Sequence, residues 1–224
     1  MGPKTRILDA TMLVFRRHGF RRSSIEQVAE AAGLTRQALY HHFESKEALF
    51  RAVIERVHES AIAAEETAVA EAETAGGNLG DILAAGMTAR ISTMIASLDG
   101  SPHLEELYSE HLVHARDLYQ TYAARYAERM VATITKIVRR QQLELPQGLS
   151  PTEFARLVEM SVYASKSQYP AMQPSDAFLK DMAVMVRTLC AGALPKSSPK
   201  SARPPIKKAA IRQKPTRRKT GGHP

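Results

Sequence analysis

Apolar residues recur three or four positions apart along most of this chain, which is the spacing of an amphipathic α-helix. The first stretch of this kind covers about residues 4–18 and stops at Gly19. No segment alternates between polar and apolar residues in the way that a half-buried strand does. The pattern therefore predicts an all-α protein.

Polar capping residues and breaks divide the rest of the pattern into further helices. A capping box is available at Ser23 with Glu26 or at Ser24 with Gln27, and another lies at Ser150 with Glu153. "TAGGNLG" (74–80) and "DGSP" (99–102) mark breaks. Helices are expected at about 24–32, 36–42, 46–57 and onward, 79–98, from Ser101 onward, 115–142, from Ser150 through Val162, and from "QPSD" (173–176) through Leu189.

Two of these helices are short and are joined by a glycine turn. Ser24–Ala32, Gly33-Leu34 and Thr35–Phe43 have the layout of a helix-turn-helix. Leu39 and Phe43 are four residues apart and give the second helix an inner face, so its polar side chains must point outward. A single α-helix fits the major groove of DNA, where Arg pairs with guanine and Gln with adenine. The predicted DNA contacts are Ser24, Thr35, Arg36, Gln37, Tyr40, His41 and Lys46, with Arg36 and Gln37 reading bases and Ser24 and Lys46 near phosphates.

Residues 6–57 resemble the DNA-binding domain of the TetR family of bacterial transcriptional regulators. The resemblance rests on "GF" at 19–20, "SSIEQVAEAAG" at 23–33 and "LYHHFESKEALF" at 39–50. Ser23 stands where the family commonly has threonine, which leaves the hydroxyl in place. The resemblance implies a second, helical domain that binds a small ligand and dimerises through its last two helices.

The expected organisation is a helix-turn-helix domain at residues 1–57, a ligand-binding and dimerisation domain at 58–194 and a disordered basic tail at 195–224. Methionine and aromatic residues of the middle helices are candidates for the ligand pocket: Met87, Met94, Tyr108, His111, Tyr122, Tyr126 and Tyr163. Two apolar faces are candidates for a four-helix dimer interface: Phe154, Leu157, Val158 and Val162, and Phe178, Met182, Met185 and Leu189.

The net charge of +8 is concentrated at the two ends of the chain. Residues 196–224 contain ten Lys and Arg residues and no acid, whereas the central part is acidic. Such a tail is typical of segments that bind nucleic acid through its phosphates. The main hypothesis is a ligand-released repressor that binds a palindromic operator as a homodimer. The alternative is a DNA-architectural protein that binds through its tail with little sequence preference.

Other chemistry is weakly indicated. His103, His111 and His114, with Glu106 and Glu110, lie close enough in sequence to raise the question of a metal site, but polar residues on a helix or cavity wall explain them as well. No catalytic spacing is present, so no enzyme activity and no cofactor are expected. The single cysteine, Cys190, is interpreted as a small core residue. Without an export signal or an apolar span, the protein is expected in the bacterial cytoplasm, associated with the nucleoid.

Overall fold

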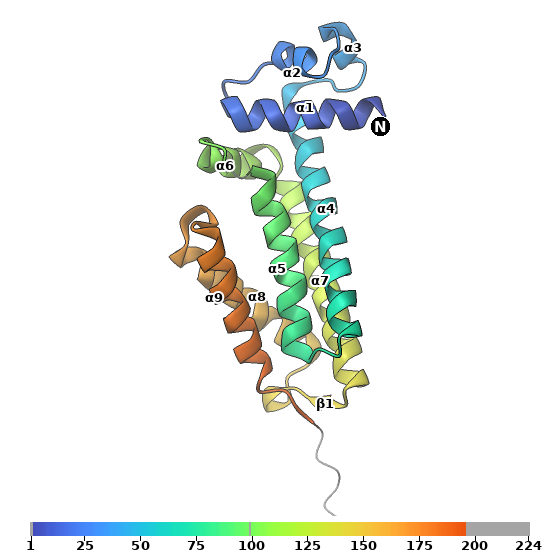
Figure 1. The fold of residues 1–224 in the computed structure, drawn as a ribbon, viewed down its shortest axis with the longest axis vertical. Coiled ribbons are helices and arrows are strands. Elements are labelled where there is room, and N and C mark those ends of the chain that lie inside the picture. The colour runs from blue at the N-terminus through green and yellow to red at the C-terminus, as the bar shows by residue number, and fades with distance from the viewer. Residues whose placement is uncertain (1, 99, 196–224) are drawn as a thin grey trace, which may run out of the picture.

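The computed structural model describes residues 2–98 and 100–195, and this part of the chain confirms the all-α prediction (Figure 1). Of the tail predicted to be disordered (195–224), residues 196–224 lie outside the described residues, whereas Pro195 is paired with Leu143 in a short strand. The helices are α1 (Pro3–His18), α2 (Ile25–Ala31), α3 (Arg36–Tyr40), α4 (Lys46–Thr74), α5 (Leu79–Leu98), α6 (Leu104–His114), α7 (Arg116–Arg140), α8 (Pro151–Gln168) and α9 (Ser175–Cys190). Short 3-10 turns at Pro146–Gly148 and Pro170–Met172 flank α8.

The first three helices and the start of α4 form a small domain at one end of the molecule. Gly19 ends α1 with a φ of 75°, and Gly33 turns the chain between α2 and α3 with a φ of 67°; both values favour glycine. Of the two possible capping boxes, Ser24 with Gln27 is the one formed. Ser23 is buried instead, and its hydroxyl donates to the Gly19 carbonyl. These local signals fix the entry to each helix.

Helix α4 connects this domain to the rest of the molecule without interruption. It ends at Thr74, where "TAGGNLG" predicted a break. The boundary proposed between residues 57 and 58 therefore falls inside one continuous helix of 29 residues. Alanine and glutamate, both strong helix formers, dominate its second half. Gly86 lets α5 lie close to that half, because a Cβ at this position would come within 2.7 Å of Val69 Cγ2.

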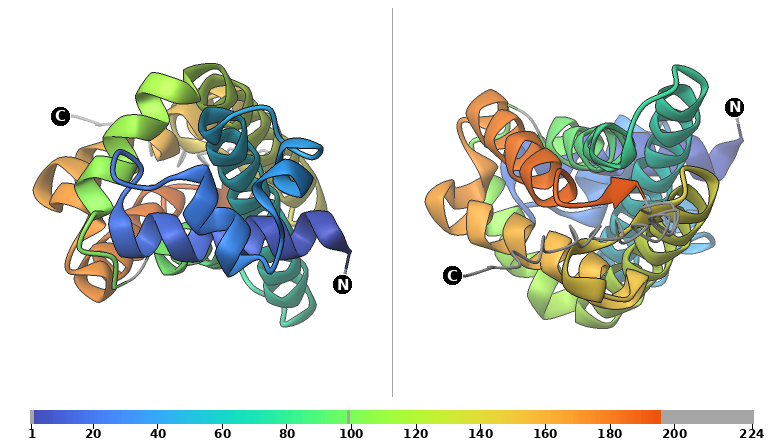
Figure 2. Two further views of the ribbon diagram at one scale, coloured as in Figure 1. Left: turned by 90° about the horizontal axis from the view of Figure 1, so that it is seen from above. Right: turned by 90° about the horizontal axis from the view of Figure 1, so that it is seen from below.

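The larger domain is a helical bundle that runs lengthwise below α1 (Figure 1). Helix α5 lies between α4 on one side and α8 and α9 on the other, as the view from below shows (Figure 2). Seen from above, α1 crosses the end of this bundle (Figure 2). Buried residues of α5, α7, α8 and α9 form one core that includes Ile82, Ile134, Phe154 and Phe178.

That core takes up five of the eight residues expected at the dimer interface and leaves Leu157, Met185 and Leu189 half-buried. Phe154, Val158 and Val162 of α8, and Phe178 and Met182 of α9, are buried within the single chain. They pack against α5 and α7, because α8 and α9 have their own bundle to cover before any second copy is added. The apolar side chains left on the outside of these helices are Met160, Tyr163 and Val184.

Three smaller features differ from the expected pattern. Helix α3 ends at Tyr40 rather than near residue 42, and α6 begins at Leu104 rather than directly after Ser101. Leu143–Glu144 (β1) pairs antiparallel with Leu194–Pro195 (β2), a two-residue pairing too short to leave an alternating pattern in the sequence. In the described part of the chain no helix has the length and apolar character needed to cross a membrane.

Candidate nucleic-acid interface and pocket

Helix α3 has one buried side and one exposed side. Leu39 is fully buried and Phe43 nearly so, and both pack with residues of α1, α2 and α4. Arg36, Gln37, Tyr40 and His41 are exposed on the other side of the helix. The structure thus brings four of the predicted DNA contacts onto one outward surface, in the arrangement that a groove-reading helix requires.

Arg36 already has partners on this surface. Its guanidinium lies 2.5 Å from the Glu26 carboxylate of α2 and donates to the Tyr40 hydroxyl at 3.4 Å. The sequence did not show this ion pair, because Glu26 belongs to the preceding helix. Since both side chains are more than half exposed, water and salt screen their attraction. A guanine or a phosphate must compete with Glu26 for Arg36.

Ser24 and Thr35 cap the two helices of the helix-turn-helix. The Ser24 hydroxyl accepts from Gln27 N, and the Thr35 hydroxyl accepts from Ala38 N at 3.1 Å. Thr35 is exposed and Ser24 is half-buried. Each hydroxyl keeps its own hydrogen available as a donor, so both residues remain predicted phosphate contacts.

Lys46 is engaged within the protein, which gives it a role that the sequence did not suggest. Its ammonium donates to the carbonyls of Phe20, Arg21 and Ser23 at 2.9, 3.4 and 3.1 Å and lies 4.4 Å from the centre of the Phe20 ring. A lysine ammonium has three donors, and all three are directed at these carbonyls. Lys46 therefore fastens the loop between α1 and α2.

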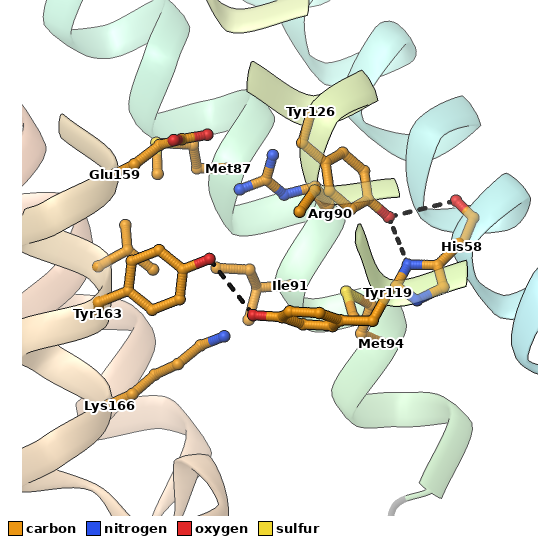
Figure 3. Close-up of a pocket in the computed structure, with 12 residues that line it drawn as sticks. His58, Met87, Arg90, Ile91, Met94, Tyr119, Tyr126, Glu159, Tyr163 and Lys166 are labelled. Carbon is orange, nitrogen blue, oxygen red and sulfur yellow. Dashed lines mark hydrogen bonds between the residues drawn. The ribbon is translucent and has the colours of Figure 1, made fainter. Parts of the chain in front are cut away.

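A cavity opens between α4, α5, α7 and α8 in the larger domain (Figure 3). Its volume is about 100 Å³. Four of the seven predicted pocket residues line it: Met87, Met94, Tyr126 and Tyr163. Tyr119 also lines it, and polar groups that the sequence did not single out complete the wall: His58, Arg90, Glu159 and Lys166.

Arg90 is the most deeply placed charge of this cavity. Its side chain is 9% exposed, its Nη1 lies 3.4 Å from Glu65, and its guanidinium stacks 4.3 Å from the centre of the Tyr126 ring. Glu65 is equally buried, and burial raises its pKa despite the neighbouring arginines. Arg90 is the one charged residue among positions 82–98 of α5, which is the sequence signal that could have identified it.

His58 closes the inner end of the cavity. Its Nδ1 shares a hydrogen bond of 2.9 Å with the Tyr126 hydroxyl, and its ring stacks on Tyr122. Burial, together with the positive charges of His111 and Arg90, lowers the pKa of His58 to about 4, so the imidazole is neutral near pH 7. Nε2 of His58 and Nε2 of His111 have no hydrogen-bond partner among the described residues.

A second, more apolar chamber lies on the other side of His58 and Met94. It is small, with a volume of about 30 Å³ between α1, α4, α5 and α6, and its wall includes Phe15, Phe50 and Leu107. Predicted pocket residues Tyr108 and His111 line this chamber instead of the first cavity. Tyr122 lines neither of these two spaces; it is buried beside His58, and its hydroxyl donates to Glu59.

The histidines of α6 and its approach do not meet at a common point. His114 pairs with Glu110 at 3.0 Å, His103 lies 3.8 Å from Glu106, and His111 faces His58 with 5.5 Å between ring centres. Within residues 2–98 and 100–195, no group of three or more His, Cys, Asp or Glu side chains is arranged to hold a metal ion.

Carboxylates of α6 and α7 hold the helix-turn-helix domain against the bundle. The buried Glu110 pairs with Arg21 Nε at 2.6 Å, and Glu106 accepts from the backbone N–H of Arg21 at 2.8 Å. Arg51 of α4 makes a two-pronged pair with Asp117 at 2.7 and 2.6 Å. The orientation of α3 relative to the bundle therefore depends on α6 as well as on α4.

By fold and by exposed surface, the chain is an all-α helix-turn-helix protein with a second helical domain that contains a cavity. Residues 7–53 match the family model described as bacterial regulatory proteins of the tetR family. This N-terminal domain therefore matches the TetR family.

Curated proteins similar to this chain are named as HTH-type transcriptional regulators or repressors. UidR of Escherichia coli K12, an HTH-type transcriptional regulator, is 40% identical over 60 residues, which are 27% of this chain and 31% of UidR. The repressor KstR2 of Rhodococcus jostii is 24% identical over half of each chain. YfiR of Bacillus subtilis, an uncharacterised HTH-type regulator, is 29% identical over 75% of this chain and 68% of YfiR. The match to UidR thus spans less than a third of that relative.

Solved structures resemble the whole described architecture. SmeT is the repressor of the multidrug efflux pump SmeDEF of Stenotrophomonas maltophilia. It matches with a TM-score of 0.59 and 25% identity, covering 91% of this chain and 96% of SmeT. A TetR-family regulator from Cytophaga hutchinsonii has a TM-score of 0.64 with 20% identity, covering 87% and 96% of the two chains. The second likeness bears on the fold alone.

Proposed function

We propose that this protein is a sequence-specific DNA-binding transcriptional regulator that reads its site with α3. The observation that carries the proposal is the outward face of Arg36, Gln37, Tyr40 and His41 above the buried Leu39 and Phe43. The family match at residues 7–53 and the regulator names of the relatives support it. In this proposal Gln37 and Arg36 read bases, whereas Ser24, Thr35, Tyr40 and His41 contact the backbone or thymine methyls.

We further propose that the protein is a repressor released from DNA by a small molecule in the cavity beside Arg90. The enclosed position of the cavity, between α4 and three bundle helices, supports this role. The relatives KstR2 and SmeT are repressors by name. If ligand and DNA oppose each other, each weakens the other by the same factor, typically about 1–3 kcal/mol.

A single α3 covers too few base pairs to define a site in a genome, so we propose that a homodimer binds a palindrome. The exposed Met160, Tyr163 and Val184 on α8 and α9 are the surface we assign to the interface. Sedimentation of the V184E variant tests this assignment. We expect a dimer for the unaltered chain and a folded monomer for the variant, since Val184 does not contribute to the core of one chain. An unaltered chain that sediments as a monomer would contradict the proposal.

Selection of bound sequences from a random DNA pool tests the regulator proposal against the architectural alternative. A regulator should enrich a two-fold symmetric sequence and bind it about 10³-fold or more tighter than random duplex. Enrichment of no sequence would instead favour an architectural protein that binds through residues 196–224. Loss of enrichment in the Gln37→Ala variant would place the preference in α3.

A further inference from the structure

The cavity beside Arg90 and the apolar chamber behind it share two wall residues. His58 and Met94 line both spaces, and the two volumes are about 100 and 30 Å³. Met94 is an unbranched side chain that changes rotamer readily. The two spaces therefore adjoin at these residues, and an elongated molecule that reaches from the first into the second must widen the inner one.

The charges of the outer cavity favour an anionic group. Arg90 and Lys166 both line this cavity, and Glu159 lines it too. Arg90 has one long contact to a carboxylate, at 3.4 Å, so most donors of its guanidinium remain unused by Glu65. Lys166 forms no ion pair within the described part of the chain. Arginine recognises carboxylates with two parallel hydrogen bonds, which Arg90 can still offer.

The aromatic side chains of the cavity argue against a cationic ligand. Tyrosine faces can attract cations, and Tyr119, Tyr126 and Tyr163 are all present (Figure 3). The protein's own cations already lie over two of them: Arg90 is 4.3 Å from the Tyr126 ring centre and Lys166 is 5.5 Å from that of Tyr163. A further positive charge from a ligand would be repelled by both Arg90 and Lys166. Burial raises the pKa of Glu159, which favours its uncharged form and weakens its attraction for a cation.

The inner chamber favours an apolar chain or ring. Phe15, Phe50, Ile54 and Leu107 line it, and together with neighbouring apolar side chains they form a small core cluster. Met12 and Phe15 in this wall belong to α1 of the helix-turn-helix domain. An apolar group that enters this chamber therefore contacts both domains.

We propose that the ligand is an elongated amphipathic carboxylate, with its anionic end at Arg90 and Lys166 and its apolar end past Met94 in the chamber beside α1. This inference gives a chemical class to the ligand of the proposed repressor. It rests on that proposed function only for the step from ligand binding to DNA release, so binding can be measured without DNA.

Calorimetric titration of the full chain with four probes below their micelle concentrations tests the class. The probes are octanoate, dodecanoate, dodecanol and dodecyltrimethylammonium. We expect dodecanoate to bind more tightly than octanoate, and about ten-fold or more tighter than the alcohol, because the alcohol lacks the charge. The ammonium probe should give no saturable binding. Tighter binding of the ammonium, equal binding of the alcohol, or no saturable binding of any probe would overturn the proposal.

Variants locate the two ends of the probe. Lys166→Met should weaken dodecanoate, and so should Arg90→Met combined with Glu65→Gln, in which the second change avoids leaving a buried carboxylate unpaired. Arg125→Met is the matched control, because Arg125 also lies over a tyrosine, Tyr122, and pairs with the α4 residue Glu59 but lines neither cavity. An equal loss of dodecanoate affinity in the Arg125→Met control would show that the carboxylate does not bind in this cavity.

Val57→Phe tests the inner chamber. Val57 lines that chamber but not the outer cavity, so a larger side chain there should weaken dodecanoate and leave octanoate unchanged. Equal affinity of both probes for the variant and the unaltered chain would show that the apolar end lies elsewhere. If dodecanoate binds as expected but does not release selected DNA, the ligand class stands and the proposed ligand-released repression fails.

Discussion

Replacing Lys46 with Met separates two roles for this side chain. In the structure its three donors meet the carbonyls of Phe20, Arg21 and Ser23, and its charge lies over the Phe20 ring. Methionine keeps most of the apolar stem but removes the donors and the charge. The change therefore leaves the loop between α1 and α2 without its link to the start of α4.

The size of the effect follows from these contacts. A hydrogen bond from a charged group contributes about 1.5–3 kcal/mol when it is protected from water. Only the Phe20 and Ser23 carbonyls are partly buried; the contact to Arg21 is exposed and longer. The three bonds also share one cation, so they do not add fully. We expect Lys46→Met to cost about 2–3 kcal/mol, which lowers the Tm of a chain this long by roughly 4–12 °C.

DNA binding distinguishes the two roles, because a phosphate contact depends on salt. Each phosphate that a cation neutralises contributes about 0.9 to the slope of log K against log salt concentration. If Lys46 is held by the three carbonyls, the variant's slope on a selected duplex equals that of the unaltered chain while its Tm falls. Arg22→Met is a matched control for the loss of one positive charge, since Arg22 is an exposed cation of the same loop. An unchanged Tm with a slope reduced by about 1 would refute the structural role.

Three further outcomes are expected. Gln37→Ala should cost about 1–3 kcal/mol on the selected duplex and little on random duplex in a gel-shift titration, and equal losses on both would exclude Gln37 from base reading. Because the pKa of His58 falls from 6.5 unfolded to about 4 folded, the unfolded chain binds more protons between these values. Lowering the pH from 7 to 5 should therefore remove about 2 kcal/mol of stability in urea unfolding. The His58→Phe variant should lose clearly less stability over the same pH range. An equal loss in the variant would show that another group titrates. Deletion after Pro195 should keep the selected sequence but weaken binding to every duplex and flatten the salt slope; identical slopes would mean that the tail does not touch DNA. The tail can reach, since 29 residues span at most roughly 95 Å and α4 is about 43 Å long.

Local features of the fold could be predicted because each depends on residues a few positions apart. The capping boxes at Ser24 and Ser150, and the turns at Gly19 and Gly33, all form where the sequence places them. A cap needs only a side-chain oxygen and the backbone N–H groups that follow it. The same holds for the outward face of α3, which follows from the spacing of its two apolar residues.

The pairings between helices could not be predicted in this way. Periodicity showed that α8 and α9 each have an apolar face, but it did not distinguish a partner helix of the same chain from one of a second copy. The cavity was missed in part for a related reason. Arg90, Glu65 and Tyr126 belong to three helices and meet only after the bundle forms. A buried charge is a weak sequence signal until its partner is known.

Helix α4 is shared by the helix-turn-helix domain and the larger domain. Phe50 near its start packs with Phe15 of α1, His58 lines both the cavity and the inner chamber, and Glu65 holds Arg90 two turns further on. One continuous helix thus carries a core residue of the helix-turn-helix domain, one residue of the cavity wall, and the carboxylate that pairs with Arg90 of that wall. The other connection is α6, whose Leu107 lines the inner chamber and whose Glu110 pairs with Arg21 beside α2. We expect a molecule that widens the chamber between Phe15 and Leu107 to displace α1 and α6 together, with the Arg21–Glu110 pair passing that displacement toward α2 and α3.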